Sequence, residues 1–252
     1  MRVLISNDDG INATGIVVLE EIAKKITKEV IVCAPDSDMS GASHSLTLRS
    51  PLRLKEHSQN HYSVNGTPTD SVVMALRHIL DEKKPDFVLS GINCDANLAE
   101  DIIYSGTVAA AMEGCILGIP AIAFSQALDK NGSVNWEVAK IYGPVVLKTV
   151  LEKFKFTKGV LLNINFPAGD IKDVKGIKIT SQGYRTIDDH VIQSVDPRGE
   201  PYFWIGSAEY RKRYDEKDLD TDLGVINSGY VSITPLSINM TEESSLSVLT
   251  EL

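Results

Sequence analysis

Short apolar runs alternate with amphipathic stretches along the first two thirds of the chain. Apolar runs that end in polar turns predict buried strands, whereas apolar residues at every third or fourth position predict helices. Residues 3–5 and 29–34 form the first two apolar runs, and the stretch 14–26 between them has one apolar face, with Thr14 as its expected cap. A strand, a helix and a second strand form a βαβ unit, so we expect a sheet that begins with parallel strands.

The same alternation continues to residue 166. Residues 67–70 read Thr-Pro-Thr-Asp, which combines a capping hydroxyl, a proline at the first helical position and an acid that can close a capping box. Three short alternating runs before this helix predict a small antiparallel excursion. We expect that excursion at 46–49, 52–55 and 62–64, further core strands at 86–90, 121–125 and 159–166, and helices at 67–80, 105–117 and 135–153.

The pattern changes after residue 167. We predict an α/β fold in which a mostly parallel sheet flanked by helices spans residues 1–167 and a β-rich C-terminal extension spans 168–252. The extension is expected to return one strand, at about 229–235, to the core. Its strand-like pieces lie at 177–180, 202–204 and 230–235, among charged stretches such as 209–222.

The composition excludes several classes of protein. The 252 residues are 43% hydrophobic and carry a net charge of −9 without a basic block, so binding to duplex nucleic acid is not expected. Three cysteines, Cys33, Cys94 and Cys115, are too few and too scattered for a disulfide framework or a zinc site, which favours a reducing compartment. The apolar stretches are too short for a signal peptide or a membrane span, so we expect a cytoplasmic protein.

The first strand ends in Ser6-Asn7-Asp8-Asp9-Gly10, which places two adjacent acids where an apolar strand enters a turn. Adjacent carboxylates repel each other, and their removal from water is costly unless a positive charge lies between them. A divalent cation such as Mg²⁺ or Mn²⁺ would supply that charge through oxygen ligands. An ordinary capped turn, with Gly10 at positive φ, remains the alternative from this motif alone.

Two further loops should meet this turn, because the carboxyl ends of parallel strands lie at one edge of a sheet. Ser40 and Asn93 each follow a core strand there, and each offers a neutral oxygen. Together with Asp8 and Asp9 they would leave a divalent ion near zero net charge, free to attract a phosphate dianion. Taken singly, a loop serine or asparagine is more often just a turn residue.

A helix predicted to begin at Ser105-Gly106-Thr107 has no acid in its first turn. Free backbone N–H groups at such an end bind phosphate, although a simple serine cap has the same sequence. His44 is the only one of the five histidines expected in a loop at this edge, where it could protonate a leaving alkoxide or donate to a phosphate. A surface histidine in a turn would look no different.

Other phosphate and ester chemistries lack their motifs here. The segment 41–45 has neither the final glycine nor the strand-to-helix setting of a hydrolase nucleophile elbow. A receiver domain needs an acceptor aspartate where this chain reads Ser90-Gly-Ile-Asn93, and haloacid dehalogenase-type phosphatases need a different spacing from Asp8-Asp9-Gly10. No Walker loop and no Gly-x-Gly-x-x-Gly motif is present in the sequence.

Six blocks of the chain combine into a specific pattern. They are Ser6-Asn-Asp-Asp-Gly10, Ala34-Pro-Asp36 with Ser40-Gly-Ala-Ser-His-Ser45, Asn65-Gly-Thr-Pro-Thr-Asp70, Ser90-Gly-Ile-Asn93, Tyr104-Ser-Gly-Thr-Val-Ala-Ala-Ala-Met-Glu-Gly114 and Gly229-Tyr-Val-Ser-Ile-Thr-Pro235. In this order the blocks resemble the SurE family of stationary-phase survival proteins. The resemblance spans nearly the whole chain, and six blocks in one order are far more specific than any single block.

The resemblance implies a fold, an activity and a site. The fold would be a Rossmann-like α/β core with a C-terminal part exchanged between the subunits of a homodimer or homotetramer. The activity would be that of a 5′- and 3′-nucleotidase on nucleoside monophosphates, with some hydrolysis of short polyphosphate. One divalent metal ion, Mg²⁺ or Mn²⁺, would be bound per subunit. The implied metal ligands are Asp8, Asp9, Ser40 and Asn93, and the implied phosphate-binding residues are Asn97, Ser105, Gly106 and Thr107.

The chain departs from the family at two positions of one loop, where Asp95 and Ala99 stand in place of the usual glycines. If these positions need positive φ, alanine is strained there and aspartate less so. Asp95 would also bring a third carboxylate near the metal, which would tighten metal binding or weaken the binding of a phosphate dianion.

Together with this resemblance, the sequence predicts a metal-dependent phosphomonoesterase that hydrolyses nucleoside monophosphates to nucleoside and phosphate, and the resemblance implies both 5′ and 3′ esters as substrates. Asp8 or Asp9 would orient or deprotonate the attacking water, and His44 would assist the leaving group. Direct attack by water is preferred over a phospho-aspartate intermediate. The alternative is a non-catalytic nucleotide- and metal-binding sensor on the same fold, which the departures at Asp95 and Ala99 favour.

Overall fold

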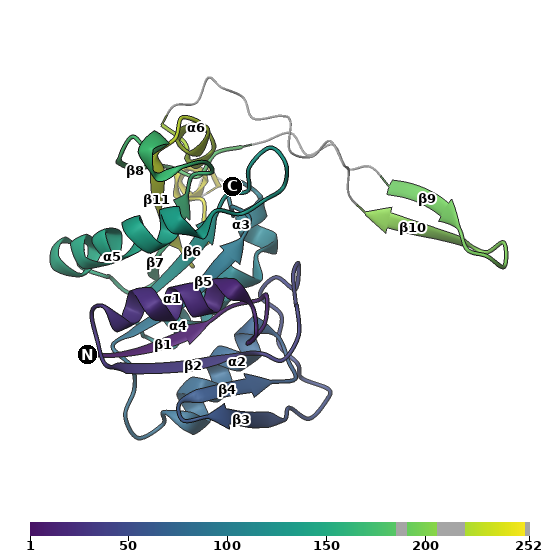
Figure 1. Ribbon diagram of the computed structural model, residues 1–252, viewed down its shortest axis with the longest axis horizontal. Coiled ribbons are helices and arrows are strands. Elements are labelled where there is room, and N and C mark those ends of the chain that lie inside the picture. Colours follow the sequence, from purple (N-terminus) through teal and green to yellow (C-terminus); the bar gives the residue numbers. More distant parts are fainter. Residues whose placement is uncertain (185–190, 206–219, 250–252) are drawn as a thin grey trace.

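One large sheet organises the computed structural model, which describes residues 1–184, 191–205 and 220–249 (Figure 1). Its strands are β1 (Arg2–Ser6), β2 (Glu29–Pro35), β3 (Leu54–Ser58), β4 (His61–Val64), β5 (Phe87–Cys94), β6 (Ala121–Gln126), β7 (Val160–Phe166), β8 (Ile177–Ile179) and β11 (Val231–Ser237). They lie in the order β3-β4-β2-β1-β5-β6-β7-β11-β8, and the strands from β4 to β7 run parallel. The predicted mostly parallel α/β sheet is confirmed.

Helices cover both faces of this sheet (Figure 1). They are α1 (Thr14–Lys24), α2 (Pro68–Met74) with the π-helical turn η1 (Ala75–Ile79), α3 (Asp101–Tyr104), α4 (Gly106–Ile116), α5 (Trp136–Lys153), the short η2 (Ile171–Asp173), α6 (Asp222–Asn227) and α7 (Glu243–Leu249). Successive residues of a strand point to opposite faces. Ile5 of β1 therefore packs in the cluster under α1 and α5, and its neighbour Leu4 packs in the cluster under α2 and α4.

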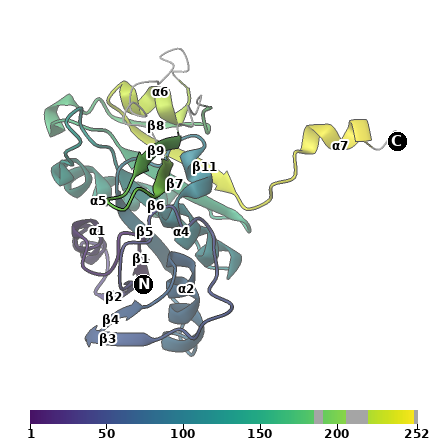
Figure 2. The same cartoon turned by 90° about the vertical axis from the view of Figure 1, so that its right-hand side faces the viewer.

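The C-terminal part of the chain both joins the sheet and leaves it. β11 pairs antiparallel with β7 and parallel with β8, so two strands that follow residue 168 extend the main sheet. Strands β9 (Val191–Val195) and β10 (Pro201–Ile205) form a separate antiparallel hairpin that stands clear of the main body (Figure 1). Figure 2 shows α7 reaching away from the body at the C-terminal end.

Local chemistry explains where several helices begin. Thr67 caps α2 in a capping box with Asp70, as predicted, and the Ser105 hydroxyl caps α4. The start of α1 differs from the prediction. Thr14 is its first helical residue, and the cap position belongs to Ala13, which has no side-chain oxygen to accept a hydrogen bond from a helix N–H group.

The strand predicted at 46–49 is wrong. The Thr67 hydroxyl donates to the Ser45 carbonyl oxygen at 2.7 Å, and the Thr47 N–H donates to the Asp70 carboxylate at 3.0 Å. These bonds hold the segment against the start of α2 instead of a neighbouring strand. The sequence pattern also missed β9, α3, α6 and α7, because such short elements carry little periodic signal. The charged stretch predicted at 209–222 lies mostly outside the described residues.

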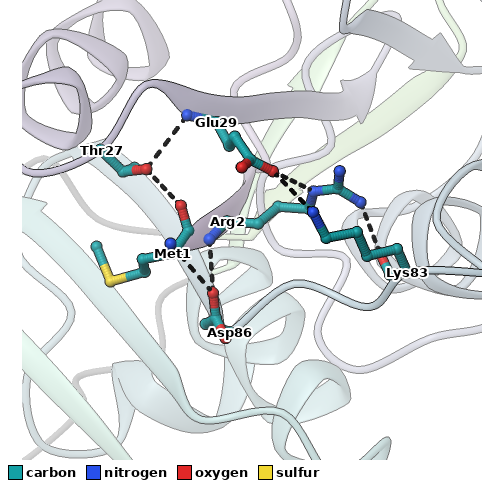
Figure 3. Close-up of polar contacts among 6 residues, drawn as sticks. All are labelled: Met1, Arg2, Thr27, Glu29, Lys83 and Asp86. Atoms are coloured by element: carbon teal, nitrogen blue, oxygen red, sulfur yellow. Dashed lines mark hydrogen bonds and ion pairs between the residues drawn. The ribbon is translucent and has the colours of Figure 1, made fainter.

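Ion pairs cover the amino-terminal ends of β1, β2 and β5 (Figure 3). Arg2 Nε donates to a Glu29 carboxylate oxygen at 3.1 Å, and Lys83 Nζ lies 3.4 Å from the same oxygen. The Arg2 backbone N–H donates to Asp86 at 2.6 Å. At this end of the strands, each acidic side chain thus lies beside a hydrogen-bond donor or a cation. In the described part of the chain, no helix has the length and hydropathy needed to span a bilayer.

Candidate metal and phosphate site

The turn after β1 is fixed by its own side chains. Asn7 donates to the carbonyl oxygen of Gly10 at 2.9 Å and accepts from the Gly10 N–H at 3.2 Å. Gly10 has a φ of +96°, and a Cβ there would lie 3.2 Å from the backbone of Ser37, so this turn requires glycine. The Met39 N–H donates to the Asp8 carbonyl oxygen at 2.9 Å, which ties the loop after β2 to the turn.

Asp8 faces the amino-terminal end of α4. Only 4% of the residue is exposed, and its carboxylate accepts the Thr107 hydroxyl and the Thr107 backbone N–H. A Cβ on Gly106 would lie 2.7 Å from the Asp8 Cβ, so only glycine lets the helix approach this closely. The partial positive charge of a helix N-terminus favours an anion at this position.

Burial is the main cause of the altered acidity of the two aspartates. It raises the pKa of Asp8 above its ordinary value of 3.8 and, together with the charge of Asp8, raises the pKa of Asp9 to about 6. Within the described residues, neither carboxylate forms an ion pair. Two acids are thus held together, largely out of water, and a bound cation would stabilise that arrangement.

Ser40 and Asn93 have hydrogen bonds that suit metal binding. The Ser40 hydroxyl donates to Asp38 at 2.6 Å, and the Asn93 amide nitrogen donates to the Asp95 carbonyl oxygen at 2.8 Å. A hydroxyl that donates its hydrogen still has oxygen lone pairs, and an amide whose nitrogen is engaged presents its oxygen. Each side chain therefore offers an oxygen atom of the kind that a hard cation binds.

Neutral oxygens make up half of the predicted metal-ligand set. Among the residues that the structure describes, no cluster of three or more His, Cys, Asp and Glu side chains is arranged to hold a metal ion. The predicted set instead combines the carboxylates of Asp8 and Asp9 with the neutral oxygens of Ser40 and Asn93. An all-oxygen donor set fits Mg²⁺ or Mn²⁺ better than a softer metal.

The first residues of α4 differ in which hydrogen-bond donors remain available to bind a phosphate. The Ser105 hydroxyl accepts the Val108 N–H at 3.0 Å and keeps its own hydrogen to donate. The Gly106 N–H belongs to the first turn, where N–H groups have no partner within the helix. Thr107 differs, because its hydroxyl and its N–H are both directed at Asp8. The three predicted residues thus lie together at the start of α4, but Thr107 is paired with Asp8.

Asn97 is held by two strands beneath its loop. Its N–H donates to Asn165 Oδ1 at 2.9 Å, its carbonyl oxygen accepts from Asn163 at 2.8 Å, and its amide nitrogen donates to the Ser125 hydroxyl at 2.9 Å. An amide nitrogen has two hydrogens, so one remains for a phosphate oxygen. Sequence reasoning missed these partners, although the two asparagines alternate within an otherwise apolar run, which was an available signal.

His44 lies on the flank of α4. Its Nε2 is 2.9 Å from Glu113 Oε2, and Glu113 follows Gly106 by about 10 Å along the helix axis. The Ser43 N–H donates to the Tyr104 carbonyl oxygen at 3.2 Å, which fixes the loop against the end of α3. The role of His44 as an acid stays a prediction, and in this arrangement its imidazole is paired with Glu113.

The two departures from the family lie in left-handed backbone. Asp95 has a φ of +117° and Ala99 a φ of +50°, so both positions meet the condition under which alanine is strained. The carboxylate that adds to the repulsion on Asp8 and Asp9 is Asp38, which sequence reasoning passed over. Its place two residues before Ser40 was the available signal.

Comparisons with known proteins find relatives that are similar over nearly the whole chain. The family model described as "Survival protein SurE" matches residues 3–189. The "5′-nucleotidase SurE" of Paramagnetospirillum magneticum is 49% identical over 249 residues, which covers 99% of this chain and 94% of that protein. The "5′-nucleotidase SurE" of Rhodopseudomonas palustris strain BisB18 is 46% identical over 252 residues, with 99% and 98% covered.

A solved structure agrees in three dimensions. The crystal structure of the SurE protein from Aquifex aeolicus is 41% identical, has a TM-score of 0.84, and the match covers 100% of this chain and 99% of that one. The likeness therefore includes the C-terminal part of the chain as well as the sheet that carries the site. On the family model and on these relatives, the chain belongs to the SurE family.

Proposed function

We propose that this protein hydrolyses nucleoside 5′-monophosphates, and 3′-monophosphates as well, to nucleoside and phosphate with the help of a divalent metal ion. The observation that carries the proposal is the enclosed pair Asp8 and Asp9, which has no cationic partner among the described residues and adjoins the N-terminus of α4. Relatives that are 46–49% identical bear the name 5′-nucleotidase, which supports the same activity here. Short polyphosphate is a further candidate substrate.

Asp8, Asp9, Ser40 and Asn93 would hold one Mg²⁺ or Mn²⁺ per subunit. When bound, such an ion would neutralise negative charge on the phosphate oxygens while the bond between phosphorus and the ester oxygen breaks. Two carboxylates and two neutral oxygens balance the charge of a divalent ion. The remaining attraction for a phosphate dianion would then come from the protein donors at the start of α4.

The protein residues have separable roles in this proposal. Asp8 is enclosed by α4, whereas Asp9 is half-buried, so Asp9 is the carboxylate that can orient a water molecule and accept its proton. The Ser105 hydroxyl, the Gly106 N–H and the Asn97 amide would bind the other phosphate oxygens. The water oxygen would attack phosphorus opposite the ester oxygen, and the leaving alkoxide would take up a proton. His44, whose Nε2 is paired with Glu113, would supply that proton from its other ring nitrogen, Nδ1.

We also propose that the extension over 168–252 mediates self-association into a homodimer or homotetramer in the cytoplasm. Large apolar side chains on the hairpin β9–β10 support this, because soluble proteins rarely leave such patches uncovered. The side chains are Val191, Ile192, Val195, Tyr202, Phe203, Trp204 and Ile205. Sedimentation velocity should show a smaller assembly for the double variant Phe203→Ser with Trp204→Ser than for the unmodified protein.

The three free cysteines fit the reducing compartment of the proposed cytoplasmic location.

A nucleotide panel crossed with a metal panel tests the proposed activity. Chelator-treated protein should release phosphate from nucleoside monophosphates when Mn²⁺ or Mg²⁺ is added, and EDTA should stop the release. Full activity in EDTA would contradict the metal role. Calorimetry on the same samples measures nucleotide binding. Binding without phosphate release would support the alternative of a non-catalytic sensor over an enzyme.

A further inference from the structure

The extension holds one residue of the Asn97 loop by both of its backbone polar groups. The Ala99 N–H donates to Asp222 Oδ2 at 3.0 Å, and the Gln182 amide nitrogen donates to the Ala99 carbonyl oxygen at 2.9 Å. Ala99 is fully buried at a φ of +50°, a conformation that a residue with a Cβ adopts only when its surroundings enforce it. The two hydrogen bonds provide that enforcement.

Asp222 joins three segments of the chain at one carboxylate. It is the first residue of α6 and is fully buried, and its Oδ1 accepts the Gly183 N–H and the Leu223 N–H, each at 2.8 Å. An ionised carboxylate has only acceptors, so it can serve all three N–H groups, including that of Ala99. An asparagine would turn a donor towards one of them and lose at least one bond.

Apolar contacts also join the Asn97 loop to α6. Leu98 and Ala99 of the loop form a small buried cluster with Leu223 and Ile226 of α6. The cluster is separate from the two large clusters that flank the sheet, so it serves the contact between loop and extension. A shift of α6 would therefore move the loop.

The loop is thus held at two points two residues apart. Strands β6 and β7 hold Asn97 through Ser125, Asn163 and Asn165, and the extension holds Ala99. We propose that Asp222 and Gln182 are positioning residues, which keep Ala99 left-handed and so aim the Asn97 amide at the substrate phosphate. The inference rests on the proposed function, because that function assigns Asn97 to the phosphate. It would make activity depend on the extension without any contact between the extension and the substrate.

Steady-state kinetics of three variants test this inference. Gln182→Ala and Asp222→Asn should raise KM for a nucleoside monophosphate by about 5-fold and about 20-fold, with a smaller change in kcat, because the phosphate contact is made in the ground state and in the transition state alike. Adding Ala99→Gly to Gln182→Ala should return KM towards the unmodified value, because glycine adopts positive φ without the tether. Gln59→Ala, in the turn between β3 and β4, is the matched control and should leave KM unchanged.

Hydrogen exchange provides a readout that does not depend on turnover. The amide hydrogens of residues 96–99 should exchange faster in Gln182→Ala than in the unmodified protein or in Gln59→Ala. An unchanged KM and unchanged exchange in Gln182→Ala would overturn the inference even if Asp222→Asn fails to fold. If the unmodified protein hydrolyses no nucleotide, both the proposed function and the inference fail. If the unmodified protein is active and the variants behave like it, only the inference is overturned.

Discussion

Carboxylates lie beside both ends of strand β1 in opposite settings: Glu29, the first residue of β2, at the amino-terminal end, and Asp8 and Asp9, in the turn after β1, at the carboxyl-terminal end. At the amino-terminal end, Glu29 accepts from Arg2 and lies beside Lys83 (Figure 3). At the carboxyl-terminal end, Asp8 accepts a hydroxyl and a backbone N–H, and Asp9 accepts the Cys94 backbone N–H at 3.4 Å. Across the described ranges of the chain, no lysine, arginine or histidine pairs with either aspartate.

The pKa values of the carboxyl groups also differ between the two ends of β1. The hydrogen bond from Arg2 and the charge of Lys83 lower the pKa of Glu29, whereas burial raises the pKa of Asp9 to about 6. An acid with a lowered pKa helps the fold at neutral pH, and an acid with a raised pKa works against it. The comparison teaches that Asp8 and Asp9 are not there for the stability of the metal-free chain, which makes them candidates for binding.

The largest expected effect comes from removing one charge at the carboxyl-terminal end. Asp9→Asn should lower kcat/KM for a nucleoside monophosphate at least about 100-fold, because it removes a metal ligand and the group that orients water. Its melting temperature without metal should stay level or rise, since the repulsion from Asp8 is gone. Activity near that of the unmodified protein, measured by phosphate release, would remove Asp9 from the site.

A smaller effect is expected at Thr107, which bonds Asp8. Thr107→Val keeps the shape of the side chain but removes the hydroxyl that donates to Asp8, so metal affinity should fall by about 10-fold. Thr107→Ser keeps the hydroxyl and serves as the control, with affinity close to the unmodified value. Mn²⁺ titration of both variants measures the effect, and an affinity of Thr107→Val equal to that of the unmodified protein would contradict the role of the hydroxyl.

The pH dependence of stability should be smaller still and has a defined sign. The folded pKa of Asp9, about 6, exceeds its ordinary value of 3.8, so the folded state binds more protons between these values. Metal-free protein should therefore lose stability through Asp9 as the pH rises from about 4 to about 6. Denaturant unfolding of the unmodified protein and of Asp9→Asn across this range isolates the contribution. A difference that is flat with pH would contradict the raised pKa.

The smallest effect is expected at the opposite end of β1. Glu29→Gln leaves Arg2 and Lys83 without their carboxylate, so the melting temperature at neutral pH should fall slightly, as is usual for exposed ion pairs. Phosphate release should not change. A loss of activity comparable to that of Asp9→Asn would break the comparison, because it would show that the two ends of the strand are not independent.

Much of the carboxyl-terminal edge could be predicted from local patterns. Apolar runs locate β1, β2 and β5, and parallel strands bring their carboxyl ends together, which is why Asp8, Ser40 and Asn93 were grouped. Ser105 was predicted as a helix start from its residue type alone, and the structure confirms it as the cap of α4.

The parts that escaped prediction depend on contacts between distant segments. Asp222 bonds Ala99 across 123 positions of the chain, and no local period reports such a contact. The predicted strand at 46–49 failed for a related reason, because its backbone bonds to Thr67 and Asp70 instead of to a neighbouring strand. Asp38 was passed over because a charged loop residue looks ordinary until its neighbours are known.

The central claim is that Asp8 and Asp9 are the anionic half of a metal site. Calorimetric titration of Mn²⁺ into chelator-treated protein tests it most directly, with the double variant Asp8→Asn with Asp9→Asn and the single variant Glu29→Gln measured beside the unmodified chain. The account predicts about one Mn²⁺ per chain for the unmodified protein and for Glu29→Gln, and none for a folded double variant. Binding of the same stoichiometry and affinity by the double variant would contradict it.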